Sequence, residues 1–172
     1  VSWWWDLIDR DPAKGLADQE LARGYLPLMQ VMDRVCLKER SNLTSYAALG
    51  VRAAYLDQGC PSDMPACEYP EKPEWDVLVF GTSDRPQRLA DAVALKNSGL
   101  RVVWAGRPGK RSLPSGIEPL PWVLPHELPE LVSRAACVLS VDYRQDIDGY
   151  CSDRVWLAAG MGACVLHRVG CW

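Results

Sequence analysis

The chain has 172 residues, of which 48% are hydrophobic and 24% are charged, and its net charge at pH 7 is −3. This is the composition of an ordinary globular protein, and no apolar run approaches the roughly 20 residues that a membrane-spanning helix needs. We find no signal peptide, and the acidic balance gives no support to phosphate-driven nucleic-acid binding.

The first 57 residues are predicted to alternate between strands and helices. Three short apolar runs are expected to be strands: residues 1–5, 33–37 and 51–56. Two helices are expected between them: residues 16–31 and 41–49. Pro27 should kink or divide the first helix, because proline lacks the donor of a helical hydrogen bond. Ser41 is a good N-cap for the second helix, and Gly50 is a good residue to end it.

Residues 58–75 interrupt this rhythm. The span contains one glycine and four prolines: Gly59, Pro61, Pro65, Pro70 and Pro73. Such a stretch is semi-extended and does not pair in a sheet, so we interpret it as a linker. It separates a partial N-terminal domain, residues 1–57, from a second domain, residues 76–172.

The second domain is predicted to be another alternating unit. Its expected strands are residues 76–80, 100–105, 120–124, 136–141 and 163–167. Its expected helices are residues 84–98, 125–134 and 152–161. This alternation indicates parallel sheets with helices on both faces, which is a Rossmann-like α/β architecture. Both ends of the chain fall beside predicted strands, so we expect the N-terminal domain to be incomplete and the second domain to be truncated at its end.

The cysteines and histidines are interpreted as structural residues. The chain has seven cysteines and no C-x-x-C pair. Four lie in or beside apolar strands and are expected to be reduced core residues: Cys36, Cys137, Cys164 and Cys171. This pattern favours a cytoplasmic protein over a disulfide framework. His126 and His167 are far apart in the chain, so we expect no zinc site.

Ligands of doubly wound sheets bind at the carboxyl ends of the strands, so the turn after residue 80 is the first candidate. Gly81 lets a ligand approach the backbone, Thr82 can donate a hydroxyl hydrogen bond, and Arg85 and Arg88 could pair with phosphate oxygens. The alternative is that Gly81 only makes the turn, Ser83 caps the next helix and the arginines are solvated.

Three further candidates follow other predicted strands. Arg107 closes the second strand of the second domain, and Trp122 could stack on a base or be an ordinary core residue. Asp6 ends the first strand and faces the expected cleft between domains, where a general base needs a carboxylate or a histidine. The alternative is that Asp6 caps the following turn.

The start of the helix at residues 152–161 is the strongest candidate anion site. Free backbone N–H groups and the helix dipole favour a diphosphate beside Tyr150 and Ser152, and Arg154 adds positive charge. Asp153 would repel a phosphate, so we expect it to face away. In the alternative interpretation Ser152 caps the helix without a ligand and Arg154 pairs with a nearby aspartate: Asp142, Asp146 or Asp148.

Three passages resemble glycosyltransferases of the GT-B fold, in particular the spore-maturation-protein-like enzymes and their group-1 relatives. The passages are residues 33–56, residues 75–106, and residues 128–141 together with 152–166, and they cover most of the chain. The most specific motif is the spacing Arg154-x-x-x-Ala158-Ala159-x-x-Gly162. The resemblance implies a GT-B fold and transfer of a sugar from a nucleoside-diphosphate-sugar donor.

The same resemblance implies a donor site in the second domain and an acceptor site in the first. Gly81, Thr82 and Arg85 would match the donor-phosphate turn, Ser152 and Arg154 the diphosphate-facing turn, and no metal or other cofactor is needed. One position departs from the family pattern: a ribose-binding glutamate is expected where this chain has Leu157. The acceptor, which could be a glycan, a protein, a small molecule or a modified DNA base, is left open.

Two alternatives to a general glycosyltransferase remain. The Leu157 departure favours a degenerate GT-B module that binds a nucleotide or a partner without transfer. A bacteriophage-type transferase that glycosylates modified DNA bases is the other, since a base-flipping pocket needs little basic surface. A basic patch would favour this bacteriophage-type function, and four residues could form one: Arg101, Arg107, Lys110 and Arg111. The simpler interpretation is that they form a solvated surface.

Overall fold

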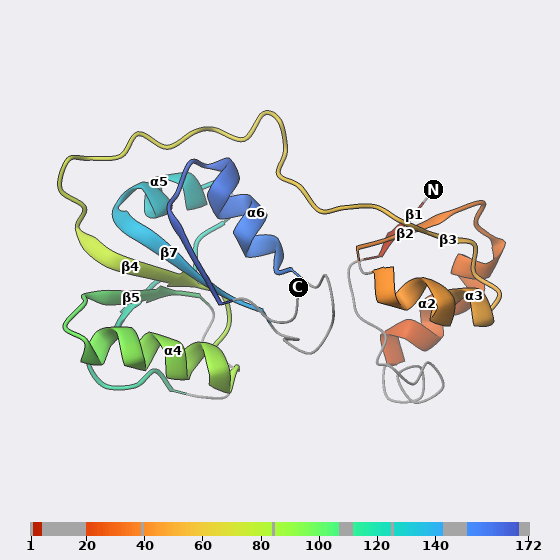
Figure 1. Cartoon of the computed structure of the whole chain (residues 1–172), viewed down its shortest axis with the longest axis horizontal. Helices are drawn as coiled ribbons and strands as arrows, with labels where there is room; N and C mark the ends of the chain where they lie inside the picture. The colour runs from red at the N-terminus through yellow and green to blue at the C-terminus, as the bar shows by residue number, and fades with distance from the viewer. Residues whose placement is uncertain are drawn as a thin grey trace. The chain divides into compact units, whose positions relative to one another are not determined.

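The computed structural model describes residues 2–4, 20–38, 40–83, 85–106, 112–124, 126–142 and 151–168. The described residues up to Gln58 fall in one compact unit, and those from Gly59 onward fall in a second unit (Figure 1). No helix in these ranges combines the length and the apolar character that crossing a membrane requires. Each unit is considered by itself below.

The first unit has a parallel three-stranded sheet in the order β1-β2-β3. The strands are β1 (Ser2–Trp4), β2 (Val35–Leu37) and β3 (Ala53–Tyr55). Its helices are α2 (Glu20–Val31), the 3-10 turn η1 (Arg40–Asn42) and α3 (Leu43–Ala48). The buried core of this unit consists of Met29, Val35, Leu37, Tyr46 and Val51.

Two details of the first unit differ from the sequence predictions. Helix α2 is one element although it contains Pro27, because the buried side chain of Met29 in the same turn packs into the core. Ser41 is not an N-cap, since the 3-10 turn occupies its position and α3 starts after Asn42. Gly50 follows α3 with φ +76°, as expected for the residue after a helix.

The second unit has a five-stranded parallel sheet in the order β6-β5-β4-β7-β8. Its strands are β4 (Trp75–Phe80), β5 (Val102–Ala105), β6 (Glu118–Leu120), β7 (Ala135–Val141) and β8 (Val165–Arg168). Its helices are α4 (Pro86–Asn97), α5 (Leu128–Ser133) and α6 (Asp153–Gly160). Helix α4 covers one face of the sheet, and α5 and α6 cover the other (Figure 1). The expected Rossmann-like α/β fold is confirmed.

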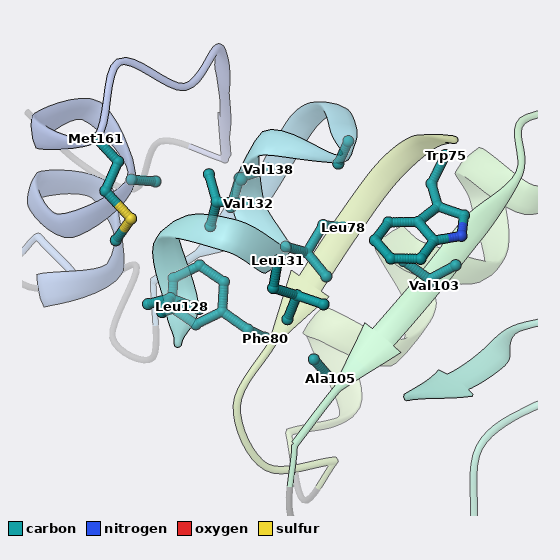
Figure 2. Packing of buried hydrophobic residues seen from close by; sticks show 12 residues of the cluster. Trp75, Leu78, Phe80, Val103, Ala105, Leu128, Leu131, Val132, Val138 and Met161 are labelled. Carbon is teal, nitrogen blue, oxygen red and sulfur yellow. The ribbon is translucent and has the colours of Figure 1, made fainter. Parts of the chain in front are cut away.

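Both faces of the central strand β4 are buried. Leu78 and Phe80 pack with α5 and its neighbours in one apolar cluster (Figure 2), whereas Val77 and Val79 pack with α4 in another. Side chains alternate between the faces of a strand, so a strand covered on both faces must be apolar throughout. Burying each large aliphatic side chain stabilises the fold by about 1.5–3 kcal/mol. The apolar run at residues 77–80 therefore produces the sheet that carries the site.

The predicted strand at residues 120–124 was misplaced. Strand β6 ends at Leu120, which pairs with Ala105, and residues 121–124 lie outside the sheet. Strand β6 is an edge strand that already contains Pro119, so the missing N–H of Pro121 does not account for this end, and nothing else in the structure explains it. This early end leaves the side chain of Trp122 exposed rather than in the core.

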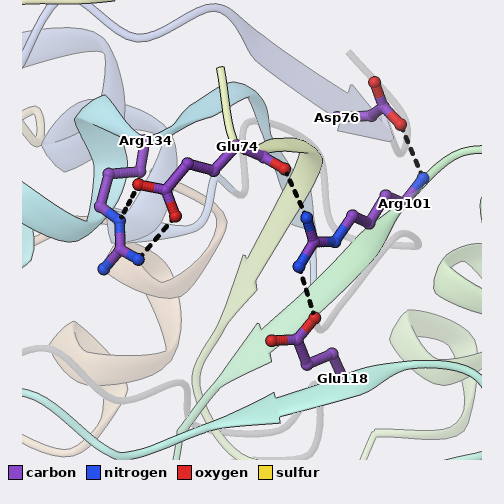
Figure 3. Close-up of polar contacts among 5 residues, drawn as sticks. All are labelled: Glu74, Asp76, Arg101, Glu118 and Arg134. Carbon is purple, nitrogen blue, oxygen red and sulfur yellow. Dashed lines mark hydrogen bonds and ion pairs between the residues drawn. The ribbon is translucent and has the colours of Figure 1, made fainter. Parts of the chain in front are cut away.

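A network of charged residues joins strands at the amino end of the sheet (Figure 3). Arg134 donates two hydrogen bonds to the carboxylate of Glu74, at 2.9 and 2.7 Å. The backbone N–H of Arg101 donates to Asp76 at 2.7 Å, and its guanidinium donates to Glu118 and to the Glu74 carbonyl, both at 3.0 Å. The hydrogen bonds from Arg134 hold the pKa of Glu74 below its usual value. These contacts fix the ends of the strands opposite to the site.

The segment between β3 and β4, which has no helix or strand, packs along the end of α6. The Cys67 N–H donates to the carbonyl of Met161 at 3.0 Å, and Cys60 lies against Gly160. The described cysteines are free thiols. Cys36 is buried and burial raises the pKa of Cys137 to about 11, but Cys164 is exposed, so its expected place in the core was wrong. Cys171 lies outside the described residues.

Candidate functional site

A pocket of about 220 Å³ opens at the carboxyl ends of β4 and β5, beside the first turn of α6. It is lined by Phe80, Gly81, Ala105, Trp122, Val123, Leu124, Leu128, Asp153, Arg154 and Leu157. Most of this wall is apolar, and the charged groups come from α6. A concave apolar site with a few converging polar groups is the usual form of a small-molecule pocket.

Arg154 is the cation of this pocket. Its Nε donates to the carbonyl of Phe80 at 3.0 Å, and its Nη1 donates to the Ser152 hydroxyl at 3.2 Å. The guanidinium lies against Gly81: a β-carbon there would be 2.8 Å from Nη2 and 2.9 Å from Nε. Gly81 also has φ +117°, which side-chain-bearing residues rarely adopt. The glycine therefore provides both the turn and the space for the arginine.

The backbone of the pocket floor is held by β5. The Gly81 N–H donates to the carbonyl of Ala105 at 2.9 Å, and the Trp104 indole donates to the Gly81 carbonyl at 2.8 Å. Gly106 lies so close to that carbonyl that it has no room for a β-carbon. These contacts hold the turn after β4, at Gly81, against the turn after β5, at Gly106, without any ligand.

Ser152 is the N-cap residue of α6 but its hydroxyl does not cap the helix; it lies 3.3 Å from an oxygen of Asp153. The Ser152 N–H instead donates to Oδ1 of Asp142 at 2.8 Å, and the Asp142 side chain is completely buried. Among the described residues the ion-pair partner of Arg154 is Asp153, at 3.7 Å, and not Asp142. Asp146 lies outside the described residues, as does Asp148.

The sequence predicted that Asp153 faces away from the pocket. This was wrong, because Asp153 lines the pocket. The adjacent Arg154 guanidinium explains why a carboxylate is tolerated there, because the two charges offset each other. A bound anion would compete with Asp153 for the same guanidinium. Trp122, which is 47% exposed, also lines the pocket, so its interpretation as an ordinary core residue was wrong.

The remaining candidates, Thr82 and Arg85, lie after β4 but do not line this pocket. Thr82 is exposed and does not line the pocket, and its carbonyl accepts from the buried Arg88 at 3.2 Å. Arg85 is the N-cap residue of α4, so Ser83 does not have that place. Arg85 lines a separate cavity of about 120 Å³ together with Asp142. The structure thus brings Gly81, Trp122 and Arg154 together and leaves Arg85 elsewhere.

Three predicted site residues lie outside the described residues: Asp6, Arg107 and Tyr150. Lys110 and Arg111 of the predicted basic patch also lie outside them, and Arg101 belongs to the network with Glu118. From the sequence, Asp142 was considered only as a partner of Arg154, and its contact with the N-cap residue of α6 was missed. Its position directly after an apolar strand was the available signal.

No protein-family model matches the sequence, and no curated protein matches it significantly. Solved structures do match. The DNA modifying enzyme β-glucosyltransferase, solved with and without its substrate uridine diphosphoglucose, has a TM-score of 0.56 and 16% identity over 78% of this chain and 46% of that one. T4 phage BGT in complex with UDP and Mn²⁺ has a TM-score of 0.55 and 15% identity over 96% of this chain and 54% of that one.

A mutant of T4 phage BGT in complex with UDP-glucose has the same TM-score and coverage at 14% identity. This chain spans about half of the length of these proteins. At such low identity the match establishes the fold: the chain has the α/β architecture of part of a GT-B glucosyltransferase.

Proposed function

We propose that the pocket beside Arg154 binds the diphosphate of a uridine diphosphate sugar, and that the chain takes part in glycosyl transfer. The observation that carries this proposal is the Arg154 guanidinium, held over Gly81 by the Phe80 carbonyl at the start of α6. Guanidinium groups bind phosphate oxygens through paired hydrogen bonds, and helix N-termini attract anions. The fold match to glucosyltransferases supports the same assignment.

Each wall of the pocket suits one part of such a donor. The bare backbone of Gly81 allows phosphate oxygens to come close, and the exposed face of Trp122 is suited to stack on the base. The ribose would lie against Leu157, which offers packing but no hydrogen bond to its hydroxyls. Affinity for the donor would therefore depend mainly on Arg154 and Trp122.

The proposed reaction is a displacement at the anomeric carbon of the sugar. A hydroxyl oxygen of the acceptor forms a bond to that carbon as the bond to the diphosphate oxygen breaks, and UDP leaves. Arg154 stabilises the negative charge that develops on the leaving diphosphate. The acceptor proton goes to a carboxylate, for which Asp6 is the candidate from the sequence.

For the acceptor we propose DNA that carries a base with a hydroxyl group. The β-glucosyltransferase that matches 78% of this chain is a DNA modifying enzyme. A flipped base is recognised by a closed pocket rather than by a broad basic face, so a net charge of −3 is compatible with this acceptor. We assign acceptor binding to the first unit and donor binding to the second.

Calorimetric titration of the full chain with UDP, UDP-glucose, GDP and ADP tests donor binding. We expect the uridine ligands to bind and Arg154→Gln to weaken them by about tenfold to a hundredfold, since a charged hydrogen bond contributes about 1.5–3 kcal/mol. Arg52→Gln is the matched control, because this arginine pairs with Asp33 in the first unit. Equal loss in both variants, or no binding of any nucleotide, would contradict the donor site.

A second candidate function is a module that binds the nucleotide sugar without transferring it. The observation in its favour is Leu157 in the pocket wall. Release of UDP from UDP-glucose, measured with and without hydroxymethylated DNA, separates the two. Acceptor-dependent release supports the transferase, whereas tight UDP binding with no release supports the module.

A further inference from the structure

Three side chains of different chemistry meet at the end of β7, outside the nucleotide pocket. Asp142 directly follows β7, His167 is in β8, and Cys151 precedes α6. One potential ligand atom of each residue lies within 4.8 Å of the other two. The His167 Nε2 atom is 3.1 Å from Oδ2 of Asp142, and the two side chains are 13% and 0% exposed.

The fold itself produces this cluster. Ser140 of β7 pairs with His167 of β8, and Asp142 lies two positions after Ser140, so Asp142 and His167 project from the same face of the sheet. The Ser152 N–H holds Oδ1 of Asp142 at 2.8 Å, which leaves Oδ2 directed at His167. Hydrogen bonds of this kind orient the carboxylates that bind metals in proteins.

We propose that Asp142, Cys151 and His167 bind a divalent ion of the zinc class, with a fourth position for water or another ligand. A thiolate, an imidazole and a carboxylate are the ligand types that zinc takes in tetrahedral sites. The thiolate distinguishes this set from the oxygen ligands that Mg²⁺ and Mn²⁺ prefer. A doubly charged ion also offsets the two negative charges that the thiolate and the buried carboxylate bring together.

From the sequence we expected no zinc site, because the two histidines are far apart. That argument assumed that two histidines are required, whereas here one histidine joins a cysteine and an aspartate. His167 pairs with Asp142, and the Cys151 thiol donates to the carbonyl of Ser152 at 3.8 Å, so the proposal rests on the convergence of the three ligand atoms. The ion would join β7, β8 and the start of α6, and this role does not depend on sugar transfer.

Cobalt(II) is the optical probe for the site, used on the full chain after chelator treatment. Tetrahedral Co²⁺ with a thiolate ligand gives visible d–d bands and a near-ultraviolet charge-transfer band. We expect both to saturate at one Co²⁺ per chain and to disappear when Zn²⁺ displaces the cobalt. Cys151→Ser should lose the charge-transfer band, and His167→Gln should weaken Co²⁺ binding by at least about tenfold. Matched controls are Cys164→Ser, an exposed thiol, and His126→Gln, an exposed imidazole.

A second measurement covers the case in which a variant folds poorly. Zn²⁺ should raise the Tm of the wild-type chain, because an ion that binds only the folded state stabilises it, and should leave the Tm of Asp142→Asn unchanged. Absence of the cobalt bands and of the Tm shift in the wild type would overturn the proposal. Charge-transfer bands that persist in Cys151→Ser or disappear in Cys164→Ser would overturn it as well.

Discussion

The guanidinium of Arg154 occupies the space that a β-carbon on Gly81 would need, with Nη2 at 2.8 Å from that position. The two residues are far apart in the sequence: Gly81 directly follows β4, and Arg154 is in the first turn of α6. The φ of +117° already favours glycine at position 81, and the absence of a side chain there leaves room for the arginine to reach the Phe80 carbonyl. This pair is the structural basis of the proposed donor site.

Gly81→Ala should therefore both destabilise the chain and damage the pocket. We expect a loss of about 1–3 kcal/mol in the free energy of unfolding from backbone strain, together with weaker UDP binding as the guanidinium is displaced. Urea unfolding and calorimetric titration measure the two effects. Gly99→Ala is the control, since this glycine also has a positive φ but faces open space. Normal UDP binding by Gly81→Ala would contradict the role of the pair.

Leu157→Glu should strengthen UDP binding by about tenfold, because a carboxylate at this wall of the pocket can accept hydrogen bonds from the ribose hydroxyls. The chain should become less stable, since Leu157 packs against the apolar cluster under α6. Leu157→Met retains the packing and supplies no acceptor. A gain that is as large for 2′,3′-dideoxyuridine diphosphate, which lacks both hydroxyls, as for UDP would mean that the ribose hydroxyls are not at this wall.

Much of the second unit could be predicted from the sequence, whereas the pocket could not. The apolar runs at β4 and β7 indicate buried parallel strands, since few other structures bury every residue of a short run. The end of β6 at Leu120 could not be predicted, because the apolar residues continue beyond it to Leu124. Asp153 was expected to face away because a carboxylate repels phosphate, and its pairing with Arg154 could not be foreseen because it depends on side-chain geometry that spacing does not encode.

Gly160→Ala should fail to give the stabilisation of up to about 1 kcal/mol that this exchange usually gives in a helix. The new β-carbon would lie 2.5 Å from the sulfur of Cys60 and 2.6 Å from its Cβ. Adding Cys60→Gly should remove the clash and recover the stability. A double-mutant cycle in urea is the measurement, and strictly additive effects would show that the segment does not press on α6.

Glu74→Gln should lower the Tm at neutral pH but not in acid. Hydrogen bonds from Arg134 lower the pKa of Glu74 from its ordinary value of 4.5, so folding favours the carboxylate. That stabilisation is complete above the ordinary pKa and is lost as the pH falls through the lower folded value. The Tm difference from wild type should therefore close as the pH falls through the lowered folded-state pKa of Glu74. Glu71→Gln, at an exposed position, should show no such difference; a gap that persists at low pH would contradict the pair.

The strand order of the second unit also bears on how the chain is made. Strand β4 takes one neighbour from β5, which follows it soon, and the other from β7, which leaves the ribosome only after β6 and α5. Until then the backbone groups along one edge of β4 have no strand partner. The four consecutive apolar residues of β4 that become buried are also not yet fully covered. The nascent chain thus passes through a stage in which the central strand of its larger sheet is half paired, and chaperones would be expected to act during that interval.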